Sequence, residues 1–258
     1  MADVHTPQPA RPKRRRGIKI VIILLLMLVS LTGLDRFGVL VAEEQISATV
    51  SDEMTAHRIT SRKPDVDVRG FPFLTQVLAG TYRDIAIHLV DVRAEGGAAT
   101  GSRDVRLPVV DIRAGDVRAG VGDLLAGRRV VAGTVAGTAT VDYATVEGLS
   151  RQEGLKLAPE GGRVRATMPV DVLGRQVTVT GLARLEPAQN VVRLRFDDLD
   201  VRGIDVSDAL RAALRQQSGR MGIDLALPAL PYPVTIERVE ATPAGLRVTG
   251  SSREVPLR

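Results

Sequence analysis

The spacing of apolar residues changes twice along the 258-residue chain. An unbroken apolar run extends from Ile20 to Leu34 without a charged residue. From Phe37 to His57 the apolar residues recur every four or five positions, which is the spacing of one helix face. Beyond Pro64 they alternate with polar residues, as in half-buried strands. The pattern therefore predicts an apolar helix, an amphipathic helix and a β-rich domain, in this order.

The apolar run has the length and the flanks of a membrane anchor. As a helix, residues 18–34 span about 26 Å, close to a hydrocarbon core of about 30 Å. A basic cluster precedes the run, and the positive-inside rule keeps such a cluster in the cytoplasm. We expect residues 1–17 to form a cytoplasmic tail, residues 18–34 a single-pass transmembrane anchor and residues 35–258 an extracytoplasmic domain.

A cleaved signal peptide shares these basic and apolar regions. Its cleavage pattern is poor here, because a cut after Ala42 would leave Leu40 at a position that prefers a small residue. A buried helix of a soluble protein is a further alternative. The sequence does not decide whether the segment is cleaved.

The period-two pattern predicts a mainly β domain with few helices. The expected strands cover residues 65–70, 81–93, 105–118, 163–173, 175–186, 191–202, 234–241 and 246–250. Helices are expected at residues 206–217, 143–149 and 121–126. The fold class is therefore α+β, with long antiparallel strands joined by short turns.

The charge of the chain belongs to its N-terminus. Residues 1–36 hold seven of the 35 basic and two of the 30 acidic residues, which leaves 28 of each in the remainder. A neutral domain gives no reason to expect nucleic-acid binding. An Asp-apolar-Arg triplet occurs six times, and we interpret it as charge pairing on a solvated sheet face. The triplets begin at Asp67, Asp91, Asp104, Asp111, Asp116 and Asp200.

Groups that carry chemistry are scarce. The chain has no cysteine, and its three histidines are scattered. It lacks a nucleophile elbow, a P-loop and a dinucleotide fingerprint. The densest acidic cluster, Asp197, Asp198 and Asp200, fits strand-end solvation better than a cation site. We expect no enzyme, no cofactor and no metal.

One segment is distinctive: Gly70-Phe71-Pro72-Phe73-Leu74-Thr75-Gln76, followed by Gly80-Thr81-Tyr82 and, near the end, by a Pro-rich segment at residues 227–233. This order resembles the actinobacterial envelope family that includes the mycobacterial lipomannan elongation factor. The resemblance covers roughly residues 37–250. It implies a long helix packed on a curved, mainly antiparallel sheet that forms an apolar groove or tube. It also implies binding of membrane phospholipid, particularly of phosphatidylinositol type, in support of lipomannan assembly. It transfers no catalytic residue.

Five residues are our candidates for lipid contact. Phe71, Phe73 and Leu74 are expected at the groove mouth, with Pro72 fixing the backbone between the two rings. Tyr82 is expected at the rim, and Tyr232 at the far end. For each aromatic ring, a place in the domain core is the alternative. The leading hypothesis is an anchored lipid-binding protein. The alternatives are a scaffolding envelope protein with a packed core, and a hydrolase or transferase.

Overall fold

The computed structural model describes residues 14–94, 104–120, 122, 130–150, 152–172, 175–188, 191–202, 222–226 and 234–256. Three helices are α1 (Arg14–Ala56), α2 (Phe73–Ala79) and α4 (Tyr143–Leu149). The strands are β1 (Ile59–Thr60), β2 (Asp65–Arg69), β3 (Thr81–Ala94), β4 (Val105–Arg118), β5 (Val131–Val141), β6 (Lys156–Glu160), β7 (Arg163–Val172), β8 (Arg175–Ala188), β9 (Val191–Arg202), β10 (Gly222–Ala226), β11 (Thr235–Thr242) and β12 (Gly245–Pro256).

The apolar and amphipathic helices expected from the sequence are one uninterrupted helix, α1. The segment between them contains no proline, and Thr32 bonds back to the Leu28 carbonyl oxygen within the helix (2.9 Å). The helix ends only at Ala56, after which Arg58 adopts a left-handed φ of 58°. The apolar half of α1 is thus rigidly continuous with the half that packs on the domain.

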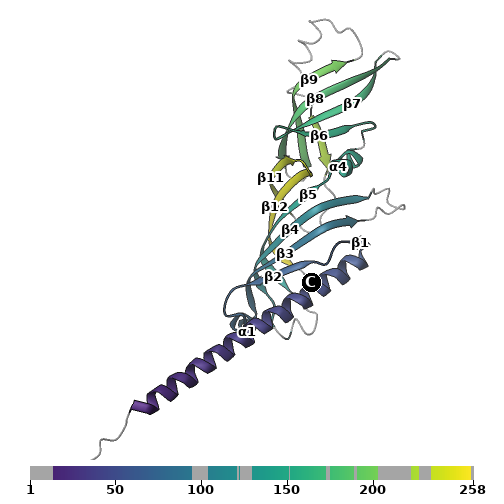
Figure 1. The fold of residues 1–258 in the computed structure, drawn as a ribbon. Helices are drawn as coiled ribbons and strands as arrows, with labels where there is room; N and C mark the ends of the chain where they lie inside the picture. Colours follow the sequence, from purple (N-terminus) through teal and green to yellow (C-terminus); the bar gives the residue numbers. More distant parts are fainter. Residues whose placement is uncertain are drawn as a thin grey trace, which may run out of the picture.

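The strands form two open antiparallel sheets. The seven-stranded sheet has the order β1-β3-β4-β5-β12-β11, with β2 also paired to β3, and the five-stranded sheet has the order β10-β9-β8-β7-β6. Figure 1 shows α1 along the seven-stranded sheet, with the five-stranded sheet at the opposite end of the molecule. The expected α+β class and antiparallel sheet are confirmed. Neither sheet closes into a barrel within the described residues.

Most predicted elements are present, and several were missed. Strands β4 and β9 and helix α4 have the predicted bounds. Strand β12 extends well beyond the predicted residues 246–250. Strands β1, β5, β6 and β10 and helix α2 were not predicted. The helices predicted at residues 206–217 and 121–126 lie outside the described residues, apart from position 122 and its helical backbone.

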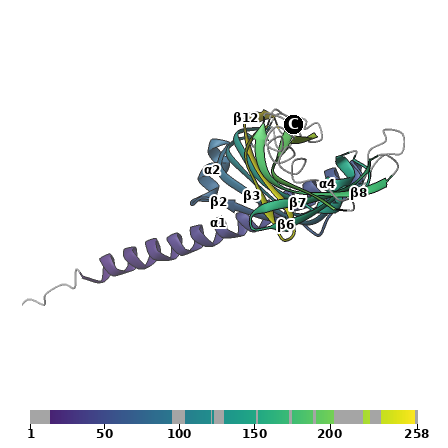
Figure 2. The same cartoon turned by 90° about the horizontal axis from the view of Figure 1, so that it is seen from above.

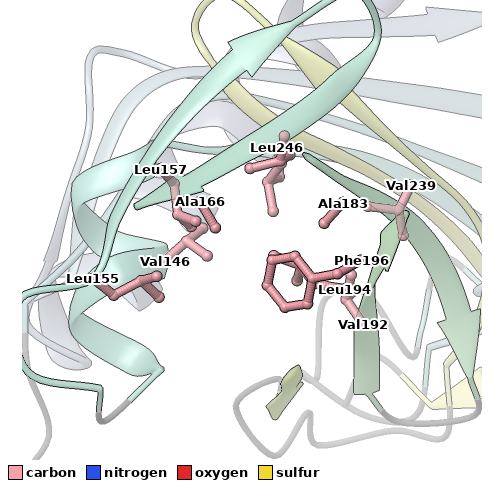
Figure 3. Packing of buried hydrophobic residues seen from close by; sticks show 11 residues of the cluster. Val146, Leu155, Leu157, Ala166, Ala183, Val192, Leu194, Phe196, Val239 and Leu246 are labelled. Carbon is pink, nitrogen blue, oxygen red and sulfur yellow. The ribbon is translucent and has the colours of Figure 1, made fainter. Parts of the chain in front are cut away.

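Two hydrophobic clusters hold these elements together. The first lies between α1, α2 and the seven-stranded sheet and includes Val39, Val68 and Phe73. The second joins the two sheets and α4. Figure 3 shows side chains from α4, from β6 to β9 and from β11 and β12 converging there, among them Val146 and Leu194. The seven-stranded sheet is therefore covered at one end by α1 and at the other by the second sheet.

Candidate functional site

One side of the seven-stranded sheet is aliphatic from β3 to β12. Directly paired residues of an antiparallel sheet project to the same side, so the register defines this side. We call it the aliphatic face. Two neighbouring rows at its middle are Ile87, Ile112, Gly137 and Gly250, followed by Leu89, Val110, Ala139 and Val248.

The aliphatic face is covered at its ends and only partly covered between them. At one end Val39 of α1 packs over Val66 and Val68. At the other end Val239 and Leu246 pack against the second sheet. In the middle rows the side chains of Ile87, Ile112, Val110, Ala139 and Val248 are only half-buried. The aliphatic side chains of these rows are therefore partly accessible between the two covered ends.

A glycine in the middle row leaves the aliphatic face without a side chain at one point. Gly137 lies between Ile112 and Gly250 in the register. A Cβ atom added at Gly137 would meet only the Asp111 carbonyl oxygen, at 3.6 Å, which is an ordinary contact. At Gly250 an added Cβ would lie 2.9 Å from the Thr235 carbonyl oxygen, so this position is closed by β11. Gly137 therefore leaves room for a Cβ atom on the aliphatic face, whereas Gly250 does not.

The opposite side of the sheet is polar. It carries two shallow depressions of about 440 and 540 Å³, lined mainly by charged residues and threonines. Asp111 lies 2.5 Å from the Nδ1 atom of His88, and Arg69 donates to Asp67 at 2.5 Å. Such a surface stays hydrated and does not suit acyl chains.

The Asp-apolar-Arg triplets supply part of this charge pairing, as predicted, although several pairs cross between strands. Arg106 reaches Asp91 at 3.3 Å, and Arg118 reaches Glu254 at 2.7 Å. Hydrogen bonding from Arg93 is the main reason why the pKa of Asp91 is lowered. The acids of the triplets thus serve the solvated face of the sheet.

The Gly70–Gly80 segment, singled out in the sequence, forms the junction between α1 and the sheet. Asp35 of α1 is 2% exposed, and its Oδ1 atom accepts a hydrogen bond from the Leu74 backbone N–H at 2.8 Å. It thereby caps the N-terminus of α2, where Pro72 provides no side-chain cap. Gln76 closes the segment by donating to the Gly70 carbonyl oxygen and accepting from the Arg83 N–H, both at 2.9 Å.

The five predicted lipid-contact residues occupy different environments. Phe73 and Tyr82 lie in the core, 5% and 8% exposed, with ring centroids 6.2 Å apart. Burial raises the pKa of the Tyr82 hydroxyl. Leu74 is half-buried in the first turn of α2. Phe71 is 54% exposed and lies under the Arg36 guanidinium, 5.4 Å from it. Tyr232 lies outside the described residues.

Sequence reasoning missed the residues of the middle rows. Strands were predicted at residues 81–93 and 105–118, but the pairing of Ile87 with Ile112, and of Ile112 with Gly137 of β5, was not identified. The usable signal was the run of Val, Ala, Gly and Thr in residues 131–141, which contains no charged residue. Such a run is typical of a strand with a small, apolar face.

Side chains that could hold a metal ion do not converge in the described part of the chain. Among these residues, no group of three or more His, Asp or Glu side chains is placed to hold a metal ion. The side chains of Asp197 and Asp198 lie outside the description. The arrangement offers an aliphatic surface and a hydrated charged surface, which is what binding of an amphiphile requires.

Comparison with known proteins agrees with this geometry. No curated protein and no solved structure matches the chain. A protein-family model described as LmeA-like phospholipid-binding matches residues 33–251, which include α2, most of both sheets and all but the apolar part of α1. The match covers most of the chain, so this protein belongs to the LmeA-like phospholipid-binding family.

Proposed function

We propose that this protein binds a phospholipid with its acyl chains against the middle rows of the aliphatic face. The observation that carries the proposal is that these rows, in a chain of a phospholipid-binding family, are aliphatic and, apart from the buried Leu89 and Gly250, only half-buried. A soluble domain that had no apolar ligand would cover such a surface with its own side chains.

The physical demand of a phospholipid fits an aliphatic surface without catalytic groups. A diacyl lipid has about 30 methylenes, and exposing them to water costs roughly 0.8 kcal/mol each, or about 24 kcal/mol. A protein that displaces such a lipid from the bilayer must therefore offer it a large apolar contact. From β3 to β12 the sheet is three strand spacings wide, about 14 Å.

The candidate site residues fit this proposal in different ways. Phe73 and Tyr82 support the fold of the end of the sheet, because both lie in the core. Phe71 and Leu74 are accessible at that end and are proposed to contact lipid there. Tyr232 is kept as a proposed contact at the far end. Arg36 is the cation nearest to Phe71 that could meet a lipid phosphate.

The proposal extends to location and pathway. The apolar half of α1 is a candidate membrane span, with large side chains that are 50% to 65% exposed from Ile22 to Leu34. We propose that it anchors the protein in the cell membrane with its N-terminus in the cytoplasm and the domain outside. An anchor holds the aliphatic face near its lipid at high effective concentration. We propose that the bound lipid is of phosphatidylinositol type and that it serves assembly of lipomannan-type envelope glycolipid.

The test is to quantify lipid that stays bound to the purified full chain after exchange into lipid-free detergent. Mass spectrometry is expected to detect about one phospholipid per chain, and Gly137→Leu is expected to remove it. The matched control is Ala136→Leu, because Ala136 neighbours Gly137 in β5 but projects to the polar side. Equal retention by both variants would mean that only α1 holds lipid. A lipid-free wild-type chain would favour a scaffolding protein instead.

The pathway is tested separately by complementation of an actinobacterial strain that lacks its own member of the family. Restoration of full-length lipomannan by the wild type and by Ala136→Leu, but not by Gly137→Leu, is the expected result. Failure of the wild type to restore lipomannan, with phospholipid binding intact, would assign the protein to another envelope pathway.

A further inference from the structure

The solvent-facing side of α1 stays apolar beyond the predicted anchor. Phe37, Leu40 and Val41 are 66%, 64% and 53% exposed, although they follow the charged pair at positions 35 and 36. From Glu44 onward the exposed positions of α1 carry polar residues or alanine. The uncharged run of residues 20–34 is about 22 Å long, which is shorter than a hydrocarbon core of about 30 Å. Extending the apolar side to Val41 lengthens it to about 33 Å.

Of the two charges inside this longer stretch, Asp35 is withdrawn from the lipid-facing side, whereas Arg36 is exposed beside Phe71. Asp35 faces the domain, is 2% exposed and accepts a hydrogen bond from Leu74. Arg36 lies over the ring of Phe71 at 5.4 Å. Long basic side chains near the end of a span extend toward the headgroups. The charge pair is therefore compatible with a helix that remains in the membrane as far as Val41.

Helix α2 lies at the level where α1 leaves the predicted anchor. Gly38 of α1 faces the Phe73 ring, and a Cβ atom added to Gly38 would lie 3.3 Å from it. Figure 2 shows α2 at the edge of the domain from which the apolar half of α1 projects. On this edge Phe71 is 54% exposed, and Leu78 is 86% exposed. Exposed large apolar side chains therefore lie at this edge on α1 and on the segment that contains α2.

We propose that Phe37, Leu40 and Val41 of α1, together with Phe71 and Leu78, form a membrane-docking surface that seats the α2 end of the domain in the interfacial layer of the bilayer. The continuity of this surface with the apolar span on one unbroken helix identifies the bilayer as its occupant. Docking in this layer sets the end of the sheet that α1 covers against the lipid headgroups. The inference rests on the anchor in the proposed function and not on lipid binding to the aliphatic face.

The chain has no tryptophan, so single-tryptophan variants can report depth directly. The full chain would be reconstituted in phosphatidylcholine and phosphatidylglycerol vesicles that contain lipids brominated near the headgroup end of the acyl chain. The test variants are Phe71→Trp and Leu78→Trp. Leu31→Trp reports the span, and Thr49→Trp is the control. Thr49 is exposed on the same helix about 18 Å beyond Phe37.

Quenching at positions 71 and 78 is expected to exceed that at position 49 several-fold. If Leu31→Trp is quenched while both test positions behave like position 49, the docking surface is refuted and the anchor stands. Absence of quenching at position 31 refutes the anchor and the docking surface together. Neither result bears on retention of lipid by the aliphatic face, which Gly137→Leu tests.

Discussion

A side chain introduced at Gly137 would change the proposed lipid site directly, because it would project from the aliphatic face. Gly137→Leu adds four carbon atoms on the aliphatic face, beside Ile112. The nearest atom to the new Cβ is the Asp111 carbonyl oxygen at 3.6 Å, so a Cβ atom at this position meets only an ordinary contact. Glycine also weakens a strand interior, so the variant is expected to unfold at the same or a higher temperature.

The expected loss of affinity follows from the displaced lipid. Four carbon atoms take the place of about four acyl methylenes, and at about 0.8 kcal/mol each the loss is about 3 kcal/mol. This corresponds to a more than 100-fold larger dissociation constant, since each step of about 1.4 kcal/mol changes a dissociation constant tenfold. Titration with a fluorescent-acyl phospholipid in detergent would measure it. Ala136→Leu adds similar bulk on the polar face and is expected to bind as the wild type does.

A Gly137→Leu protein that is folded and binds phospholipid as tightly as the wild type would show that the acyl chains do not lie on the aliphatic face at Gly137. The same loss in Ala136→Leu would show that bulk anywhere on β5 disturbs binding, and that the aliphatic face has no special role.

Three further predictions concern the framework of the site. Asp35→Ala removes the cap of α2 and is expected to lower the free energy of unfolding by about 1 kcal/mol, measured by thermal denaturation. The control Asp52→Ala, at an exposed position of the same helix, is expected to change this free energy little. Equal effects of the two variants would contradict the capping role of Asp35. Leu194→Ala, at a side chain with 0% exposure, is expected to lower the free energy of unfolding in denaturant by about 2–5 kcal/mol. Leu78→Ala, at 86% exposure, is expected to lower it by less than about 0.5 kcal/mol. Similar losses in the two variants would show that the inter-sheet cluster is not packed. Burial raises the pKa of Tyr82 in the folded state, so folding favours the neutral hydroxyl. The contribution of Tyr82 to the free energy of unfolding is therefore complete below the ordinary tyrosine pKa of about 10. It is lost as the pH rises through the higher pKa of the folded state. Tyr82→Phe is expected to lose less stability than the wild type between pH 9 and 11, and an unchanged alkaline profile would remove Tyr82 as the cause.

The sequence predicted those elements whose pattern is locally complete. Strand β4 alternates regularly, and α4 begins after Asp142, whose Oδ1 atom accepts from the Thr145 N–H at 2.7 Å. Strand β5 was missed because its Ala, Gly and Thr residues give no clear contrast between its two faces. Helix α2 was missed because its first turn is stabilised by Asp35, which lies 39 residues from Leu74 in the chain.

The candidate site depended on contacts that a local pattern does not contain. The Gly-Phe-Pro-Phe segment forms the junction between α1 and the sheet, and which ring would be buried there depended on α1. Phe73 is buried against Gly38 of α1 and beside Tyr82, and Phe71 is left exposed beside Arg36. Gly137 gained its importance only from the register that places it beside Ile112. Long-range pairing of this kind is set by the packed fold and not by the residues of one strand.

Photo-crosslinking is the most direct test of the proposal that phospholipid acyl chains lie on the aliphatic face. A phospholipid with a diazirine in its acyl chain would be incorporated into vesicles with the full chain, irradiated, and its adducts mapped by mass spectrometry. The account predicts adducts on the middle rows of the aliphatic face, around Ile112 and Val110, in addition to those on the apolar half of α1. Adducts on α1 alone, or equally on the polar face at Ala136 and Thr138, would contradict it.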